Sequence, residues 1–305
     1  MRIVSRPDFD GIVCAVLLFE ALDIQKPVFW VEPGDLQNGR IAIKAGDVIA
    51  NLPYHPSCRM WFDHHISNRP DTAFDGAFAI KPSAARVIYD HFSERLHPRF
   101  DALVSAADKI DAAALNQEEV LHPERFPIVL VSMTVTGQDT EGAPYWDHLV
   151  TLLRRHAIPA VHNDPWVADR CQRATQQNEA YQKLLATHTR VDGHVSIIDF
   201  RNRTPAPIGN RFLVYCLFPE TIVNVKIRRD DAQPDRLIVS VGHSIFNRQC
   251  RVNVGRLMQR FQGGGHRGAG ACNFQESREK DILPEIISVL KENKDIDPVS
   301  GDTAK

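Results

Sequence analysis

The chain has 305 residues, of which 43% are hydrophobic, and its formal net charge is -2. This length allows two domains with substantial cores. The near-neutral net charge argues against binding of long nucleic acid through the overall charge of the protein, but it is compatible with a local basic cleft. The six cysteines include no C-x-x-C pair, so neither a disulfide framework nor a zinc knuckle is indicated. The apolar run at residues 12–19 is too short to span a bilayer. We therefore expect a soluble, cytoplasmic protein.

The first segment predicts a strand at residues 2–5, an acidic turn with a glycine at 6–11 and an apolar helix at 12–22. This order is typical of the start of an α/β domain. Asp8 and Asp10 lie two positions apart in the turn, where an extended backbone would direct both side chains to one point. Helix capping would need only one aspartate, so the pair favours metal binding.

Further strands are predicted at residues 28–31, beside Asp47, and in the apolar segment that ends in Asp63-His64-His65. The carboxyl end of a buried strand lies at the sheet edge where ligands bind in open α/β folds. Neighbouring residues on a strand point to opposite sides, so one histidine could hold a metal while the other faces a substrate. For Asp47, a plain turn residue is an almost equally good interpretation.

Helical spacing predicts helices at residues 83–96 and 100–107, and the second is followed by Asp108-Lys109-Ile110-Asp111. Acids at a helix C-terminus lie against the negative pole of the helix dipole, which costs stability. This misfit favours a functional role for at least one of them. For Asp111, the simpler interpretation is an ion pair with Lys109 or a cap of the next helix.

A long polar helix at residues 166–188 has the composition of a connector, and strands are predicted beyond it at 195–198, 221–227 and 237–241. The predicted fold class is α/β, with an N-terminal parallel sheet flanked by helices, a connector helix and a smaller C-terminal α/β domain with a mixed sheet. The predicted bounds are 1–160 for the first domain, 161–190 for the connector, 191–292 for the second domain and 293–305 for a flexible tail.

One loop of the second domain, residues 263–270, has the sequence GGGHRGAG. Three consecutive glycines let the backbone approach a ligand and expose its N–H groups, and His266 and Arg267 add positive charge. The loop could cradle an anion, although it lacks the Gly-Lys-Ser/Thr of a P-loop; a flexible hairpin turn is the alternative. Asn247 and Arg248, upstream, could add phosphate contacts.

Several of these features occur together and in order: Asp8-Phe9-Asp10-Gly11, Asp47, Asp63-His64-His65, Asp108 and the GGGHRGAG loop. With them the chain resembles the DHH phosphoesterases that carry a C-terminal DHH-associated domain, over nearly its whole length except the tail. Members of that family include single-strand exonucleases, oligoribonucleases, cyclic-dinucleotide phosphodiesterases, exopolyphosphatases and type II pyrophosphatases.

The resemblance implies a catalytic domain with two Mn²⁺ (or Mg²⁺) ions and a DHH-associated domain that binds the substrate. It implies these metal ligands: Asp8 for one ion, Asp10, His64 and Asp108 for the other, and Asp47 between them. His65 would face the substrate phosphate and Asp63 would orient a neighbouring group. The expected substrate-binding residues are Asn247, Arg248, Gly264, Gly265, His266 and Arg267. Two ions can share a water and clamp phosphoryl oxygens, and no protein nucleophile is evident, so a hydroxide bridging the ions is the expected attacking group.

The sequence departs from the family near its start. Many relatives carry a histidine shortly before the first aspartate, whereas Val4, Ser5 and Arg6 fill these positions here. Arg6 would repel a cation, so we expect the first ion to bind weakly, with extra water, or only with substrate. Arg6 could instead contact a substrate phosphate.

The expected function is metal-dependent hydrolysis of phosphodiester or phosphomonoester bonds in short oligonucleotides or small nucleotides. An exopolyphosphatase-like or pyrophosphatase-like hydrolase of phosphoanhydrides is one alternative, and a catalytically weak nucleotide sensor is another. Expected partners are a short oligonucleotide, a nucleotide or polyphosphate, with no membrane and no long duplex DNA, and a homodimer is compatible with the sequence.

Overall fold

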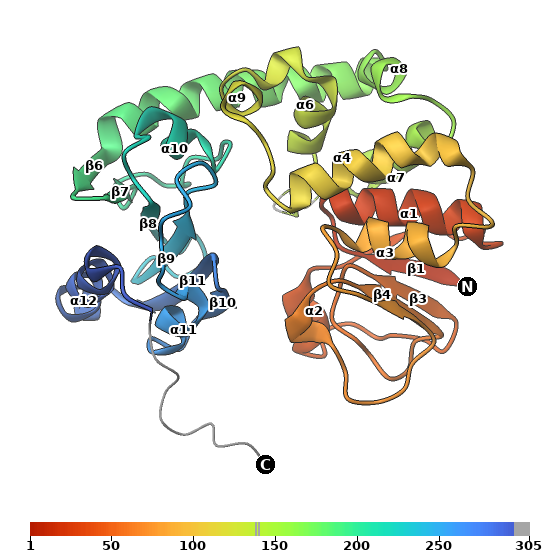
Figure 1. Ribbon diagram of the computed structural model, residues 1–305, viewed down its shortest axis with the longest axis horizontal. Coiled ribbons are helices and arrows are strands. Elements are labelled where there is room, and N and C mark those ends of the chain that lie inside the picture. Colours follow the sequence, from red (N-terminus) through yellow and green to blue (C-terminus); the bar gives the residue numbers. More distant parts are fainter. Residues whose placement is uncertain (138, 140, 296–305) are drawn as a thin grey trace. The chain divides into compact units, whose positions relative to one another are not determined.

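A computed structural model describes residues 1–137, 139 and 141–295, and it divides the chain into two compact units (Figure 1). Unit 1 comprises Met1–Leu115 and His122–Thr175. Unit 2 comprises Asn116–Leu121 and the chain from Gln176 on. The predicted flexible tail lies, from residue 296 on, outside the described residues.

Unit 1 is built on a parallel sheet in the strand order β2-β1-β3-β4-β5. The strands are β1 (Arg2–Ser5), β2 (Phe29–Trp30), β3 (Asp47–Ala50), β4 (Met60–Asp63) and β5 (Gly76–Phe78). Short, nearly continuous apolar runs such as these are typical of strands buried on both faces. Ser5 pairs with Ala50, and Ala50 pairs with Phe62, so β1, β3 and β4 end at the same edge.

The helices of unit 1 pack on both faces of this sheet and against one another. They are α1 (Phe9–Ala21), α2 (Pro33–Gln37), α3 (Ala84–His91), α4 (Asp101–Asp111), α6 (Pro127–Met133), α7 (Ala143–Leu153) and α8 (Ile158–His162). The apolar helix α1 packs against α3, α4 and α7 above one face (Figure 1), where Ile3 and Phe62 join its core. Val4 and Trp61, the neighbours of those residues in sequence, point to the opposite face, where α2 contributes Leu36.

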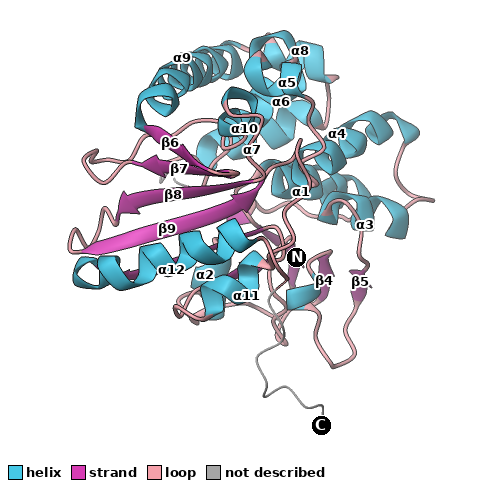
Figure 2. Cartoon of the chain, turned by 60° about the vertical axis from the view of Figure 1, so that its left-hand side comes forward, coloured by secondary structure: helices cyan, strands magenta, loops and turns pink. Residues whose placement is uncertain are grey.

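Unit 2 holds a mixed sheet in the order β10-β11-β9-β8-β7-β6, in which only β7 and β8 pair in parallel among the described strands. The strands are β6 (Thr189–Asp192), β7 (Val195–Asp199), β8 (Val223–Arg229), β9 (Arg236–His243), β10 (Gly264–His266) and β11 (Ala269–Gln275). The helices are α5 (Gln117–Leu121), α10 (Leu213–Leu217), α11 (Val254–Gln259) and α12 (Glu279–Glu292). The helix α12 contacts β7, and Figure 2 shows it along the sheet of unit 2.

The long helix α9 (Pro165–His188) begins in unit 1 and continues into unit 2. The predicted fold class is therefore confirmed: a parallel sheet with helices, a helical connector and a mixed sheet. No helix among the described residues is both long and apolar enough to cross a bilayer.

Candidate metal centre

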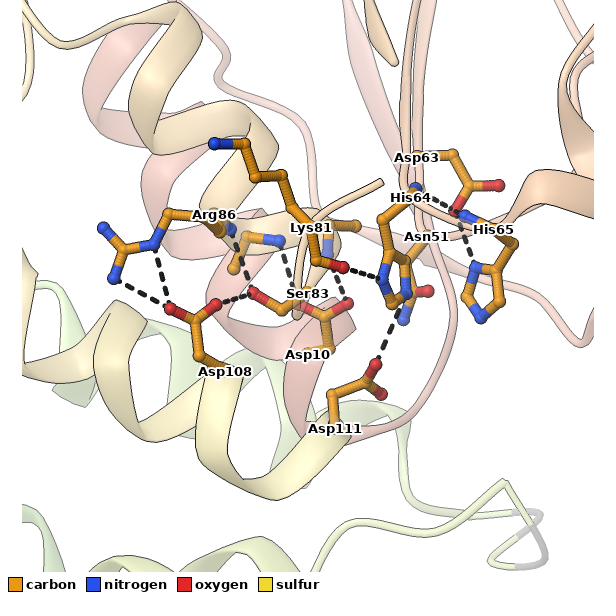
Figure 3. A network of polar contacts seen from close by, with 12 residues as sticks. Asp10, Asn51, Asp63, His64, His65, Lys81, Ser83, Arg86, Asp108 and Asp111 are labelled. Atoms are coloured by element: carbon orange, nitrogen blue, oxygen red, sulfur yellow. Dashed lines mark hydrogen bonds and ion pairs between the residues drawn. The ribbon is translucent and has the colours of Figure 1, made fainter. Parts of the chain in front are cut away.

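Polar side chains gather where β1, β3 and β4 end (Figure 3). The turn after β1 carries Asp8 and Asp10, Asn51 directly follows β3, and β4 ends at Asp63. The last residue of α4, Asp111, lies against the same group. The C-terminal edge of a parallel sheet thus collects acids and histidines from distant parts of the chain, as expected for an α/β ligand site.

Asp10 is almost completely buried, with 2% of its surface exposed. Its carboxylate accepts hydrogen bonds from the backbone N–H groups of Ala84 and Ala85, both at 2.9 Å. These N–H groups belong to the first turn of α3, where a helix favours negative charge. Burial nevertheless raises the pKa of Asp10 well above its ordinary value, and the carboxylates of Asp111 and Asp8 raise it further. A bound cation would offset this cost.

His64 is held in a defined tautomer. Its Nδ1 lies 3.0 Å from the carbonyl oxygen of Lys81. A carbonyl only accepts, so Nδ1 donates, and Nε2 of the neutral ring presents a lone pair. That Nε2 lies 3.3 Å from Asp111 Oδ2 and is buried without a hydrogen bond among the described residues. With the ring neutral, two acceptors face each other, an arrangement that a cation between them would satisfy.

The donor set fits a divalent ion. One ligand atom each from Asp10, His64 and Asp111 lies within 4.8 Å of the other two. Carboxylates suit Mg²⁺ and Mn²⁺, and the imidazole favours Mn²⁺. The bond from His64 Nδ1 to a backbone carbonyl is the usual way in which a protein orients a metal-binding histidine.

Asn51 is a member of this site that the sequence interpretation missed. It is 2% exposed, its φ angle is 55°, and its Nδ2 donates to Asp8 Oδ1 at 2.9 Å. Its Oδ1 is buried and has no hydrogen-bond partner in the described part of the chain. Asparagine tolerates the left-handed conformation better than most residues, so an Asn directly after an apolar strand was the available signal.

Asp8 has a different environment from Asp10. Its Oδ1 caps α1 by accepting from Gly11 N at 2.8 Å, and its Oδ2 lies 3.2 Å from Arg6 Nε. Burial raises the pKa of Asp8 to about 6, although the Arg6 charge opposes the shift. Asp8 is thus a partly neutralised capping residue at the rim of the group.

Gly11 is required by the close turn between β1 and α1. A Cβ atom there would lie 1.9 Å from the carbonyl oxygen of Arg6. We expect Gly11→Ala to lower the free energy of unfolding by about 1–3 kcal/mol, as overpacking does. Gly34→Ala is the matched control, since a Cβ at Gly34 meets nothing within 4 Å. Urea unfolding of both variants measures the free energy of unfolding, and an equal decrease in the two variants would contradict the prediction.

Asp63 fixes the orientation of His65. Asp63 is fully buried, and its Oδ1 accepts from His64 N at 2.8 Å and contacts His65 Nδ1 at 2.8 Å. Its Oδ2 accepts from Asn68 Nδ2 at 2.7 Å. Burial is the largest single influence and lowers the pKa of His65, but the hydrogen bond to Asp63 and the negative charges of Asp63 and Asp111 together outweigh it, so the pKa is raised. Asp63, His64 and His65 could also surround an ion, but the Asp63 carboxylate already has these hydrogen-bond partners.

The structure places Asp47 away from this group. It is the first residue of β3 and therefore lies at the opposite end of the strand from Asn51. There its carboxylate accepts from Arg2 Nε at 3.0 Å and from Lys44 N at 2.9 Å. Burial is the largest single influence and raises the pKa of Asp47, but the hydrogen bonds from Arg2 and Lys44 and their positive charges together outweigh it, so the pKa is lowered. Asp47 is not brought to the group because the apolar run that follows it, rather than precedes it, forms the strand.

The structure also separates Asp108 from the group of three ligands. Asp108 Oδ1 accepts from the Ser83 hydroxyl at 2.6 Å, and Oδ2 accepts from Arg86 Nε at 2.9 Å. Ser83 caps α3, so Asp108 supports the helix that holds Asp10. The helix α4 continues to Asp111 instead of ending near residue 107, which carries the acid next to His64 one turn further along.

The glycine loop of unit 2 is a β-hairpin in which Gly265 pairs with Gly270. Gly264, Gly265 and His266 form the exposed strand β10.

Arg267 lies 3.4 Å from Asp295 and donates to the carbonyl of Arg251. In the same unit Asn247 N donates to Ser244 Oγ, and Arg248 Nε donates to the carbonyl of Ile245. A cavity of about 630 Å³ is lined by Arg248, Arg251 and Arg267 together with Gln249, Cys250, Glu292 and Asn293. Substrate binding by these residues stays a prediction.

Three solved structures place this geometry in context. The pGpG-specific phosphodiesterase PggH of Vibrio cholerae matches with a TM-score of 0.80 and 26% identity, over 96% of this chain and 99% of that chain. An exopolyphosphatase-related protein of Bacteroides fragilis matches with a TM-score of 0.53 and 12% identity, over 96% and 90%. RecJ of Thermus thermophilus in complex with Mn²⁺ matches with a TM-score of 0.58 and 12% identity, over 97% of this chain and 53% of RecJ.

The two structures that share 12% identity with this chain establish a common fold only. Scans against protein-family models and against the curated proteins find no match. The matched structures cover both units, and the Asp-His-His triplet lies at the end of β4 in the site described above. Along its full length, the chain has the structure of the DHH phosphoesterase superfamily.

Proposed function

We propose that the protein is a metal-dependent phosphodiesterase that hydrolyses short oligonucleotides, with the dinucleotide pGpG as the first candidate substrate. The observation that carries the proposal is the contact of His64 Nε2 with Asp111 Oδ2, two acceptors beside the buried Asp10 carboxylate. The substrate class is supported by the likeness to a pGpG-specific phosphodiesterase along almost all of both chains.

A bound divalent cation supplies Lewis-acid stabilisation of the phosphoryl group and a water of lowered pKa. The protein residues hold the cation and orient its ligands. The first turn of α3 fixes Asp10, the Lys81 carbonyl fixes His64, and the end of α4 supplies Asp111. His65, whose pKa is raised through Asp63, favours the cationic form that attracts a phosphate.

The test is turnover of pGpG by the purified full-length chain in Mn²⁺. We expect GMP to be released, because cleavage of the single internal diester yields two mononucleotides. We expect chelation of the metal by EDTA to abolish the reaction and renewed Mn²⁺ to restore it. Chromatography of the products measures this. Asp35→Asn, at an exposed acid of α2 paired with Arg40, is the control and should react like the wild type.

The same assay separates the alternatives. Release of orthophosphate from polyphosphate, without cleavage of pGpG, would identify a phosphoanhydride hydrolase instead. Binding of pGpG without turnover, in Mn²⁺ and in Mg²⁺, would identify a nucleotide sensor. Either result contradicts the proposal.

A further inference from the structure

The two first-motif aspartates are not equally able to bind an ion. Asp8 Oδ1 accepts from Gly11 N at 2.8 Å and from Asn51 Nδ2 at 2.9 Å, and its Oδ2 faces Arg6 Nε at 3.2 Å. An ion approaching Asp8 would have to displace a guanidinium and would then lie beside its positive charge. An ion bound to Asp8 and the Arg6 guanidinium would both be positive and a few ångströms apart, and such charges repel strongly at the rim of a buried site.

The neighbouring position is built for an ion. Asp10, His64 and Asp111 bring three ligand atoms within 4.8 Å of one another, and Asp8 is not part of that group. The Asp63 carboxylate, in the alternative group, already has backbone, imidazole and amide partners. The orphaned Oδ1 of Asn51, on a side chain that is 2% exposed and hydrogen-bonded to Asp8, is a further acceptor at the same edge. The described residues therefore offer one well-formed cation position.

We propose that this centre takes one divalent cation, at Asp10, His64 and Asp111, and that the Arg6 guanidinium provides the second positive charge by binding a phosphate oxygen of the substrate. Asp8 then positions Arg6 instead of holding an ion. Its contact is to Nε, and the two terminal nitrogens of an arginine carry four further N–H donors in a geometry that matches phosphate. The Arg6 side chain is 40% exposed, so a ligand can reach it. The substrate part of this inference rests on the proposed function, whereas the number of ions does not.

The number of ions is tested first. Metal-free protein is titrated with Mn²⁺ alone and followed by native mass spectrometry and isothermal titration calorimetry. We expect one Mn²⁺ per chain in the wild type, retention of that ion in Arg6→Gln, and its loss in Asp111→Asn. A second ion that binds only to Arg6→Gln would support the proposal, because the guanidinium is then what excludes it. Two ions of comparable affinity in the wild type would overturn it.

The role of Arg6 is tested with three variants. We expect Arg6→Gln to lower kcat/KM for pGpG by about 100-fold, the usual loss on removal of one transition-state donor. Arg6→Lys should recover part of it as a point charge. Arg2→Gln is the matched control, because Arg2 forms an equivalent ion pair with Asp47 at the other end of the sheet; it should stay within about threefold of the wild type. Unchanged kcat/KM in Arg6→Gln would overturn the assignment.

Failure of the proposed function can be told apart from failure of this inference. A protein that binds one Mn²⁺ but cleaves no phosphodiester contradicts the proposed function and leaves the single ion supported. Binding of inorganic phosphate to the Mn²⁺-loaded protein then replaces turnover as the measure of Arg6. Weaker phosphate binding in Arg6→Gln than in Arg2→Gln supports the assignment, and equal binding overturns it.

Discussion

Asp111→Asn is expected to abolish turnover, with a fall in kcat/KM of roughly three orders of magnitude. The carboxylate of Asp111 lies 3.3 Å from His64 Nε2 and is one of three groups able to hold the ion. An amide in its place keeps the size but removes the charge. A metal ion contributes several kcal/mol to stabilising a phosphoryl transition state, and each 1.36 kcal/mol is a factor of ten in rate. Steady-state kinetics with pGpG in saturating Mn²⁺ measures the effect.

Asp108→Asn is the matched control, because it changes an acid one turn earlier on the same helix. Asp108 holds Ser83 and Arg86 and so acts on Asp10 only through α3. We expect kcat/KM of Asp108→Asn to fall about 10- to 100-fold, as is usual when a residue that supports a metal ligand is changed. The assignment of ligands fails if Asp108→Asn is the more damaged variant or if Asp111→Asn retains wild-type Mn²⁺ affinity.

This pair of acids shows what the sequence can and cannot predict. The spacing of apolar residues located α4, and the acids at its end were recognised as unfavourable for the helix dipole. Which acid faces His64 depends on where the helix stops, and helix ends are poorly defined by sequence, because the last turn is fixed by packing and capping. Because the sequence does not fix the end of α4, it favours an ion pair or a cap as the role of Asp111.

Asp47 and Asn51 show the same limit on a strand. The sequence leaves Asp47 open between a metal ligand, which the family resemblance implies, and a plain turn residue. The direction of the strand places Asp47 at the opposite edge of the sheet and Asn51 at the site. By contrast, the sequence favours Asp10 and His64 as metal ligands, and the structure brings both beside Asp111, because a turn with two acids and a strand that ends in histidines leave little freedom in placement. The fold class followed from the order of strands and helices, which does not depend on exact boundaries.

The stability of the metal-free protein is expected to fall as the pH rises, and Mn²⁺ is expected to reverse the fall. Burial raises the pKa of Asp8 from 3.8 to about 6, and that of Asp10 well above its ordinary value. A carboxyl group whose folded-state pKa is raised binds its proton more tightly in the folded chain. Its contribution is therefore complete below about pH 4 and is lost as the pH rises through 6. For Asp8, the shift of about two units corresponds to roughly 3 kcal/mol at most.

Mn²⁺ binds the ionised form, so its effect should be small at pH 5 and large at pH 8. At a concentration one hundred times its Kd, a ligand that binds only the folded state adds about 2.7 kcal/mol, which corresponds to a rise in Tm of roughly 5–10 °C for a domain of this size. Thermal unfolding at both pH values, with EDTA or with Mn²⁺, measures the difference. In Asp111→Asn the Mn²⁺ effect should vanish at pH 8, whereas in Asp35→Asn, which changes an exposed acid paired with Arg40, it should persist. A Tm rise that is equal at pH 5 and pH 8, or that survives in Asp111→Asn, would mean that the ion stabilises the protein from somewhere other than this carboxylate group.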